Sequence, residues 1–474
     1  MGFTEPIFIF LFLPCFLLFY FGSYALEKRF AGFGRLRIRE IILCLFSLLF
    51  YSFFNLYYLS WISAMVVLTF LGGLWVDRSK RKKPALATTV GTLLAVLGFF
   101  KYAAYYSGVW FGETAFGRLS APLGISFIIF SAVSYLVDIY RGDAPAGDLL
   151  DAAVFLTFFP KVISGPIVLW KEFDGKIKNA RPNTELFFNG INRVCIGFAK
   201  KTILADTFGS FVNEVLQNMN VGIDTASAWI MMLFFFFEIY FDFSGYSDIA
   251  VGISEIVGVE IGENFRFPYL ATSVTDFWKR WHISLGNWFK EYVYIPLGGN
   301  RRSKPRTALN LFIVFLITGI WHGAGLLYLL WGCMHGIIRV AEYLLHGSKL
   351  YQRIPAVIKW AFTTFAVMIG WMAFCFRSPE EIIRFFGTLF GISVSEKVGI
   401  TALYFCNIKA ISVTVIALLG ALLFGAPPLK RLVNKLRGSA AGLAITEVFV
   451  LGLFVLALIF MINSTYSPFL YFQY

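Results

Sequence analysis

The sequence predicts an all-α polytopic membrane protein, because long apolar segments dominate a chain with few charges. Of its 474 residues, 58% are hydrophobic and 15% are charged. Apolar runs of about 18 or more residues, enough to cross the hydrocarbon core as helices, recur from one end of the chain to the other. Because hydrocarbon offers no water, the backbone of each run must pair within its own segment, as a helix allows. The bilayer is therefore the expected solvent.

The candidate membrane spans follow one another along the chain. In order, they cover about residues 7–25, 41–58, 60–76, 85–104, 120–140, 187–210, 227–254, 307–323, 326–345, 357–377, 408–426 and 445–463. The first span lacks a basic segment before it and a convincing cleavage site after it, so we expect it to be retained. We expect about 11 or 12 transmembrane helices, with re-entrant and interfacial helices, in one integral-membrane domain over residues 1–474. Its N-terminal spans lie in 1–140, its core at about 150–345 and its C-terminal spans in 355–474.

Lysine and arginine concentrate in loops between these spans, and this pattern gives the expected orientation. The basic stretches lie within residues 27–40, 77–84, 171–181, 279–306, 349–359 and 430–437. Residues 105–119, 213–226 and the tail after Met461 hold few or no basic side chains. Because basic loops stay in the cytoplasm, we expect about twelve crossings and extracytoplasmic termini. The same loops account for the net charge of +13, so no nucleic-acid partner is expected.

Two stretches do not fit a simple span. Residues 151–170 lie between loops that both look cytoplasmic, and Pro160 and Pro166 interrupt a helix there. We expect a re-entrant or broken element at this position, buried in protein or lining a cavity.

The second exception, 273–297, is predicted to be one amphipathic helix that begins with a cap formed by Ser273 and Asp276. A helical period places apolar side chains on one face. They are Phe277, Trp281, Leu285, Trp288 and Tyr292. Tryptophans on one face and basic residues elsewhere are typical of a helix at the membrane–water boundary.

His322 is the most informative single residue, because a histidine at membrane depth is costly and usually functional. Counted from Arg306 at about 1.5 Å per residue, its ring lies about 24 Å deep. Gly319, Gly323 and Gly325 are expected to leave space beside the ring, as a substrate tunnel needs. Neutral imidazole acts as a general base near neutral pH, so a catalytic role is favoured over a packing role.

His282 is the second candidate site residue. Arg280 stands two residues before it, and a positive charge nearby would favour the neutral imidazole. The ring either orients the donor or the catalytic base, or is a solvated histidine at headgroup level. His335 is interpreted mainly as a packing residue, and His346 as a solvated residue at a cytoplasmic helix end.

Asp242 and Asp248 lie within or near a span, where burying a carboxylate costs free energy unless it is ion-paired or hydrated. We expect Lys or Arg partners from the segment 273–297. Structural ion pairing and cavity lining remain equally open for both carboxylates.

No metal site is expected, because the histidines stand far apart in sequence and no Cys or carboxylate completes a tetrahedral ligand set. The six cysteines lie singly, mostly in apolar runs, and are expected to be small buried hydrophobes without disulfides.

Several motifs together resemble the membrane-bound O-acyltransferase family. They are Tyr240–Asp248 (YFDFSGYSD), Glu263–Phe265 (ENF), Phe277–Leu285 (FWKRWHISL) and Trp321–Ala324 (WHGA). The stretch Tyr294–Arg301 (YIPLGGNR) is similar to the bacterial alginate O-acetyltransferase branch. One departure stands out, since that branch has Phe-Pro-His where this chain has Phe159-Pro160-Lys161. The roles of Lys161 and His335 are left open.

The resemblance implies a multi-helix bundle around a tunnel and O-acyl transfer across the membrane. It places the catalytic histidine at His322 and the second polar active-site position at His282. Further residues in these motifs are candidates for binding substrate or donor. They are Asp242, Asp248, Asn264, Trp278, Arg280, Trp281 and Trp321.

The resemblance further implies acetyl-CoA as the cytoplasmic donor, with no bound cofactor. The acceptor is an extracytoplasmic polysaccharide, such as alginate, reached directly or through a secreted or membrane-anchored acetyltransferase of the SGNH-hydrolase type. The expected location is the bacterial cytoplasmic (inner) membrane. Two alternatives stay open: D-alanyl transfer from a carrier-protein thioester to teichoic acid, and a lipid or polysaccharide transporter or flippase without enzymatic activity.

Overall fold

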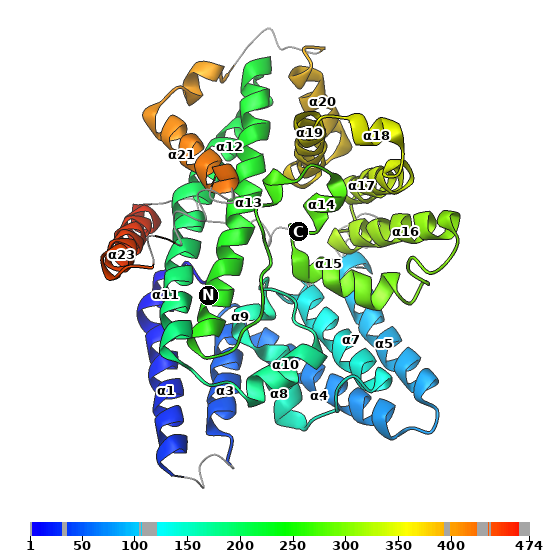
Figure 1. Cartoon of the computed structure of the whole chain (residues 1–474), viewed down its shortest axis with the longest axis vertical. Coiled ribbons are helices and arrows are strands. Elements are labelled where there is room, and N and C mark those ends of the chain that lie inside the picture. The colour runs from blue at the N-terminus through cyan, green and yellow to red at the C-terminus, as the bar shows by residue number, and fades with distance from the viewer. Residues whose placement is uncertain are drawn as a thin grey trace. The chain divides into compact units, whose positions relative to one another are not determined.

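The computed structural model describes residues 2–30, 36–103, 106, 121–392, 399–423, 435 and 438–463. In these ranges all regular elements are helices (Figure 1). One isolated bridge joins Ile223 and Ile400. The predicted all-α class is therefore confirmed. The chain divides into two compact units, Met1–Val194 with Tyr246–Gly262, and Cys195–Gly245 with Glu263–Tyr474.

The first unit contains the helices predicted from the first five spans. They are η1 (Phe8–Phe12) with α1 (Leu13–Arg29), α3 (Ile38–Ser52), α4 (Leu56–Arg78), α5 (Lys82–Gly98) with η2 (Phe99–Ala103), and α7 (Ile125–Arg141). Its core is aromatic, and the ring of Phe159 packs between those of Phe12, Phe16 and Phe50 with centroids 5.0–5.5 Å away.

The proline-containing stretch 151–170 is a broken element, as predicted. Helix α8 (Leu149–Thr157) ends before Pro160, the short α9 (Phe159–Val162) follows, and α10 (Trp170–Lys178) begins after an extended link. Asp148 and Asp151 form a reciprocal capping box at the start of α8. Lys161 is buried on α9, with Nζ 2.9 Å from Ser131 Oγ and 3.9 Å from the ring centroid of Phe155.

The helices of the second unit follow the remaining spans, and α11 (Thr184–Ala199) and α13 (Thr225–Ile256) contribute residues to both units. The others are η3 (Lys200–Ala205), α12 (Asp206–Asn218), η4 (Pro268–Leu270), α14 (Val274–Trp278), α15 (Ile283–Phe289), η5 (Lys290–Tyr294), α16 (Lys304–His322), α17 (Leu326–Leu345), α18 (Lys349–Arg353), α19 (Ala356–Cys375), α20 (Pro379–Leu389), η6 (Ala402–Phe405), α21 (Ile408–Leu418), η7 (Leu419–Leu423) and α23 (Ala440–Asn463).

Six described helices are long and apolar enough to cross a membrane. They are Phe8–Arg29, Leu56–Arg78, Lys82–Tyr102, Thr225–Ile256, Ala356–Cys375 and Ala440–Asn463. The most apolar window of Thr225–Ile256 is 78% buried within the protein, whereas that of Ala440–Asn463 is 11% buried. Helices at the other predicted spans do not combine this length and apolarity: α17 has 20 residues but is not among the six, and the 15 residues of α3 reach about 22 Å, less than the ~30 Å hydrocarbon core.

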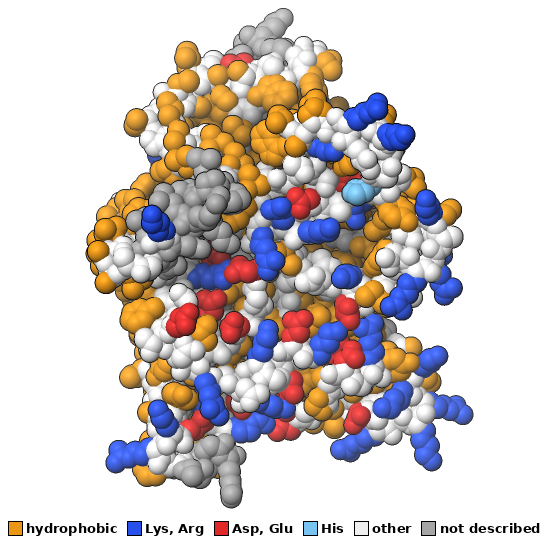
Figure 2. Space-filling view, viewed as in Figure 1, with side chains coloured by type: hydrophobic (Ala, Val, Ile, Leu, Met, Phe, Trp, Pro, Cys, Tyr) orange, Lys and Arg blue, Asp and Glu red, His pale blue; other side chains and the backbone are white. Residues whose placement is uncertain are grey.

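The exposed side chains of many helices are hydrophobic, as a lipid environment requires. Leu18 on α1 is 72% exposed and Val448 on α23 is 71% exposed. Figure 2 shows such side chains over α21 and α23, and Lys and Arg side chains around the loop between α4 and α5. The chain is thus a multi-pass membrane protein. Residues 105 and 107–119, and the tail from residue 464, lie outside the described part of the chain.

The prediction of one continuous amphipathic helix over 273–297 is wrong. The Ser273 side chain does accept a hydrogen bond from the main-chain N–H of Asp276, but α14 ends at Trp278. His282 then adopts a left-handed backbone conformation (φ 45°) before α15 begins. Main-chain hydrogen bonds of Arg280 and Ile283 with Arg266 and Asn264 replace helical bonds, and so stabilise the break.

Candidate active site

Helices α16 and α17 form a tight hairpin that places His322 at the end of α16. A Cβ added at Gly319 would lie 2.5 Å from the carbonyl oxygen of Tyr328 and 3.0 Å from Cα of Gly332. A Cβ at Gly323 would lie 2.4 Å from the Tyr328 ring. The prediction of open space is therefore wrong for Gly319 and Gly323, because α17 and its Tyr328 fill that space, whereas a Cβ at Gly325 would lie 3.6 Å from the Tyr328 ring.

Aromatic rings surround His322. Its ring centroid lies 5.1 Å from that of Trp331 and 5.0 Å from that of Phe374, both nearly edge-to-face. The neighbouring Trp321 ring lies at 4.6 Å. Trp331 also packs against His335, with centroids 4.9 Å apart, so that this indole separates two imidazoles.

His282 is held by Asn264. Its Nδ1 lies 3.1 Å from Asn264 Oδ1. The same oxygen accepts hydrogen bonds from the Ser284 main-chain N–H at 3.2 Å and from Ser284 Oγ at 2.8 Å. The Phe243 ring stands edge-on to the imidazole with centroids 4.7 Å apart. The loop before α14 and the turn after it thus fix this ring together.

His282 is buried, so its interpretation as a solvated headgroup histidine is wrong. Burial lowers the pKa of His282 from its ordinary 6.5 to about 3, because desolvation disfavours the charged ring. The cause is therefore burial, whereas the Arg280 guanidinium makes its ion pair with Asp276, Nε to Oδ1 at 2.9 Å.

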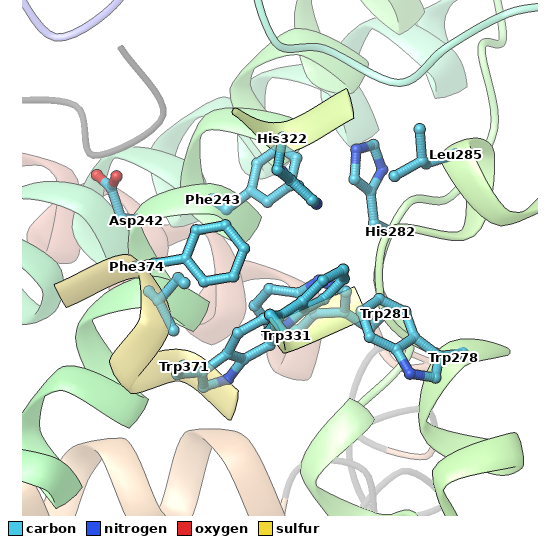
Figure 3. A pocket seen from close by; sticks show the side chains of 11 residues that line it. Asp242, Phe243, Trp278, Trp281, His282, Leu285, His322, Trp331, Trp371 and Phe374 are labelled. Carbon is cyan, nitrogen blue, oxygen red and sulfur yellow. The ribbon is translucent and has the colours of Figure 1, made fainter. Parts of the chain in front are cut away.

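The two histidines line one cavity of about 40 Å³. In Figure 3 their rings lie on its upper side and the tryptophans on its lower side. The lining residues are Ile239, Asp242, Phe243, Trp278, Trp281, His282, Leu285, His322, Trp331, Trp371 and Phe374. A cavity needs about 10–15 Å³ in this measure to hold one water molecule, so there is room for a small polar group or about three waters.

Asp242 lines this cavity, but its carboxylate points away from the histidine rings (Figure 3). Lys201 Nζ lies 2.7 Å from Asp242 Oδ1 and 2.6 Å from Asp206 Oδ1. The expectation that Asp242 pairs with the segment 273–297 is wrong, because the partner comes from η3. Glu238, one turn before Asp242 on α13, is also buried.

Asp248 belongs to the first unit, where its Oδ1 lies 3.1 Å from Arg193 Nη2. The prediction of a partner from 273–297 is wrong for this carboxylate as well. Of the other candidate binding residues, Trp278 and Trp281 line the cavity, whereas Asn264, Arg280 and Trp321 are not among its lining residues. The described residues contain no group of three or more His, Cys, Asp and Glu placed to hold a metal ion.

Sequence reasoning missed part of the cavity wall. Trp371 and Phe374 come from α19, beyond the motifs that carry the family resemblance. Trp371 and Phe374 are spaced by about one helical turn, which places them on one face of an apolar helix. The sequence offered this spacing as a signal for a cavity wall, but the same spacing is equally typical of ordinary helix packing. Glu342 was also missed: its carboxylate accepts the main-chain N–H groups of Val274 at 2.6 Å and Thr275 at 2.7 Å, and so anchors the start of α14.

The chain is similar to known proteins over most of its length. Residues 10–378 match the membrane-bound O-acyltransferase family. The chain is 35% identical to the "Probable alginate O-acetylase AlgI" of Pseudomonas putida, over 100% of both chains. It is 32% identical to the peptidoglycan O-acetyltransferase of Helicobacter pylori, over 82% of this chain and 80% of that protein.

A third relative is more distant. The teichoic acid D-alanyltransferase of Bacillus subtilis is 29% identical over 55% of this chain and 68% of its own length. The family match contains every residue that lines the cavity, and the similarity to the Pseudomonas protein extends over the whole chain. This chain therefore belongs to the membrane-bound O-acyltransferase family and is a multi-pass membrane O-acyltransferase.

Proposed function

We propose that this enzyme takes an acetyl group from cytoplasmic acetyl-CoA and delivers it across the cytoplasmic membrane of a bacterium for O-acetylation of an extracytoplasmic polysaccharide. The observation that carries this proposal is that His322 and His282 line one small aromatic cavity. Its volume of about 40 Å³ suits an acetyl group better than a long acyl chain. The relatives named for alginate and peptidoglycan acetylation support a glycan acceptor.

His322 acts as the general base in this proposal. It removes the proton from the acceptor hydroxyl, whose oxygen attacks the thioester carbonyl carbon. A C–O bond forms, the C–S bond breaks, and the imidazolium returns its proton to the leaving thiolate. The acceptor hydroxyl belongs to the polysaccharide or to a partner acetyltransferase of the SGNH-hydrolase type that passes the acetyl group on.

The tetrahedral oxyanion in this reaction needs hydrogen-bond donors. The indole N–H groups of Trp278 and Trp331 are buried on the cavity wall and have no acceptor within the described residues. Both are therefore available to a bound thioester carbonyl. Exposed basic residues before α16, among them Arg301 and Arg302, would attract the phosphates of the donor by charge.

The decisive experiment incubates the purified protein and its partner with radiolabelled acetyl-CoA and measures label on the acceptor. His322→Ala is expected to lose about 10² to 10⁴-fold in rate, the usual contribution of general-base catalysis, while still folding and inserting. His346→Ala is the matched control, because His346 is exposed beyond the end of α17.

Wild-type rates in His322→Ala would refute the role of His322. Label transfer from a D-alanyl carrier protein, with none from acetyl-CoA, would instead support the function named for the Bacillus relative. Movement of a lipid or polysaccharide without any acyl donor would support a transporter.

A further inference from the structure

The amide orientation of Asn264 can be read from its neighbours. The main-chain N–H of Ser284 can only donate a hydrogen bond, and it lies 3.2 Å from the Oδ1 position of Asn264. The atom at that position must therefore be the amide oxygen, since an amide nitrogen would face a second donor. The Ser284 hydroxyl lies 2.8 Å from the same atom and 3.4 Å from His282 Nδ1, and the shorter distance makes it a donor to Asn264 Oδ1.

This orientation determines which nitrogen of His282 carries the proton. The imidazole Nδ1 faces Asn264 Oδ1 at 3.1 Å, and an amide oxygen accepts hydrogen bonds but never donates them. Because the Ser284 hydroxyl donates to Asn264 Oδ1, Nδ1 faces an acceptor and is the protonated nitrogen in this arrangement. In a neutral imidazole the other nitrogen, Nε2, then carries a lone pair and is an acceptor.

We propose that Asn264 is a positioning residue that holds His282 as the Nδ1-protonated tautomer, so that Nε2 meets the cavity as a hydrogen-bond acceptor. The inference rests on the proposed function, because it concerns the same cavity. It also sharpens that function: His282 cannot supply a donor to the oxyanion in this state. Its Nε2 instead orients an O–H group of the acceptor, beside His322.

The surroundings of His282 favour the neutral ring. The cavity wall carries two other titratable side chains, His322 and Asp242, and the Asp242 carboxylate is engaged by Lys201. Phe243 covers one edge of the imidazole, and burial opposes its protonation. Exchange of the tautomer would require Asn264 to rotate its amide and lose the hydrogen bond from the Ser284 main chain, or the Ser284 hydroxyl to turn from Asn264 Oδ1 to Nδ1, which lies 3.4 Å away.

The tautomer can be measured directly. The chain contains four histidines, so the ¹⁵N spectrum of the full-length protein labelled at histidine, in detergent or nanodiscs, is simple. A protonated and an unprotonated ring nitrogen give well-separated signals, and a His282→Gln spectrum assigns those of His282. We expect Nδ1 protonated and Nε2 unprotonated near neutral pH.

Variants of Asn264 test the positioning role. Asn264→Leu removes the acceptor, so the tautomer preference should disappear and kcat should fall roughly 10- to 100-fold, as when a residue that orients a metal-ligating histidine is lost. The KM for acetyl-CoA should change little.

Asn264→Asp keeps an acceptor oxygen, and should preserve the tautomer and restore most of kcat. The added charge favours protonated His282, so the acid limb of the pH–rate profile should move to higher pH.

Asn310→Leu is the matched control. Asn310 is equally buried but donates to the main-chain carbonyls of Leu297 and Gly299, so its loss should lower stability without changing the His282 signals. The proposal is overturned if wild-type His282 is protonated on Nε2. It is also overturned if Asn264→Leu keeps the tautomer, or lowers kcat no more than Asn310→Leu does.

If Asn264→Leu folds poorly, the ¹⁵N spectra of the wild type and of Asn264→Asp test the proposed tautomer instead. A wild-type protein that transfers no acetyl group would refute the proposed function, whereas the tautomer measurement would still stand.

Discussion

At the scale of single residues, aromatic side chains set the size of the space beside His322. The Phe374 ring lies edge-on to the imidazole and also packs against Trp331, with centroids 5.5 Å apart. A buried ring at this position limits how far an acyl chain can extend past the base. Phe374 is therefore expected to act on donor selection more than on the chemistry of transfer.

We predict that Phe374→Ala raises the rate with propionyl-CoA relative to acetyl-CoA by at least about 10-fold, because one methylene in a tight pocket is worth roughly 1–3 kcal/mol. The change should also cost about 3–5 kcal/mol of stability, as for other buried Phe→Ala changes. Competition between the two labelled donors measures the ratio. Phe365→Ala, on the same helix but partly exposed, is the control and should leave the ratio unchanged.

A second residue-scale prediction concerns pH. His282 has a pKa of about 3 in the folded protein and about 6.5 when unfolded. Between pH 7.5 and 5.5 the unfolded state therefore gains a proton that the folded state does not bind. The free energy of unfolding should fall by about 1.4 kcal/mol over this range from His282 alone.

Denaturant unfolding in detergent at pH 7.5 and 5.5 measures this loss. In His282→Gln the decrease between the two pH values should be smaller by about 1.4 kcal/mol, since the titrating group is gone. An equal decrease in the variant and in the wild type would show that His282 is not held neutral by the fold.

The sequence indicated both histidines, because titratable rings in apolar or aromatic segments are rare. It could not indicate that Asn264 holds His282 or that Lys201 pairs with Asp242. These contacts join residues from separate elements, and nothing in the local pattern around Asn264 or Lys201 distinguishes their partners. The glycines near His322 were misread for the same reason, since the neighbour that fills their space is on another helix.

At the scale of elements, the α16–α17 hairpin depends on main-chain approach at two glycines. Gly319 and Gly332 face each other, and a Cβ at Gly332 would lie 2.7 Å from the carbonyl oxygen of Phe315. Close backbone contact through glycine is a common device for packing helices in membranes. Because His322 follows Gly319 by one turn, this contact also sets where the base stands.

We predict that Gly319→Ala separates the two helices, lowers stability by about 1–3 kcal/mol as overpacking does, and reduces transfer at least about 10-fold. Gly91→Ala on α5 is the matched control. A Cβ at Gly91 meets no atom of the described residues within 4 Å, so alanine there should be neutral or stabilising by up to about 1 kcal/mol. Thermal unfolding and acetyl transfer measure both effects; full activity in Gly319→Ala would show that the contact does not position His322.

Element existence was predictable, since every candidate span contains a helix in the described residues. The broken element at 151–170 was also predictable, because proline acts locally. The interruption at 279–282 was not, because the apolar period continues through it and the break depends on hydrogen bonds to residues 264–266. Local sequence patterns thus predicted the helices, whereas long-range hydrogen bonds determine that α14 ends at Trp278.

At the scale of the whole molecule, loops predicted to lie on one side of the membrane contact each other within their own unit. In the first unit Arg37 Nη1 lies 2.6 Å from Asp148 Oδ2, and both belong to loops predicted to be cytoplasmic. In the second unit Ile223 pairs with Ile400. Ile223 lies in the stretch 213–226, predicted to be extracytoplasmic, and the alternation of the predicted crossings places Ile400 on the same side. An odd error in the number of crossings between these loops would have placed the partners on opposite sides, so the contacts favour an even number of crossings, as predicted.

These contacts do not distinguish inside from outside, but thiol labelling does. Cys406 is exposed in the stretch 378–407, which the alternation of the twelve predicted crossings places on the extracytoplasmic side. We predict that a membrane-impermeant maleimide labels Cys406 in intact spheroplasts, and that Cys406→Ser removes this labelling.

Lys80 is exposed in the basic loop between α4 and α5, so Lys80→Cys in the Cys406→Ser protein should react after permeabilisation and not before. The five other cysteines are buried or half-buried and lie mostly within helices, so they should contribute little background. Labelling of Lys80→Cys before permeabilisation, with Cys406 reacting only afterwards, would show that the chain has the opposite orientation. The donor side of the His322 cavity would then face away from the cytoplasmic thioester that the proposed reaction requires.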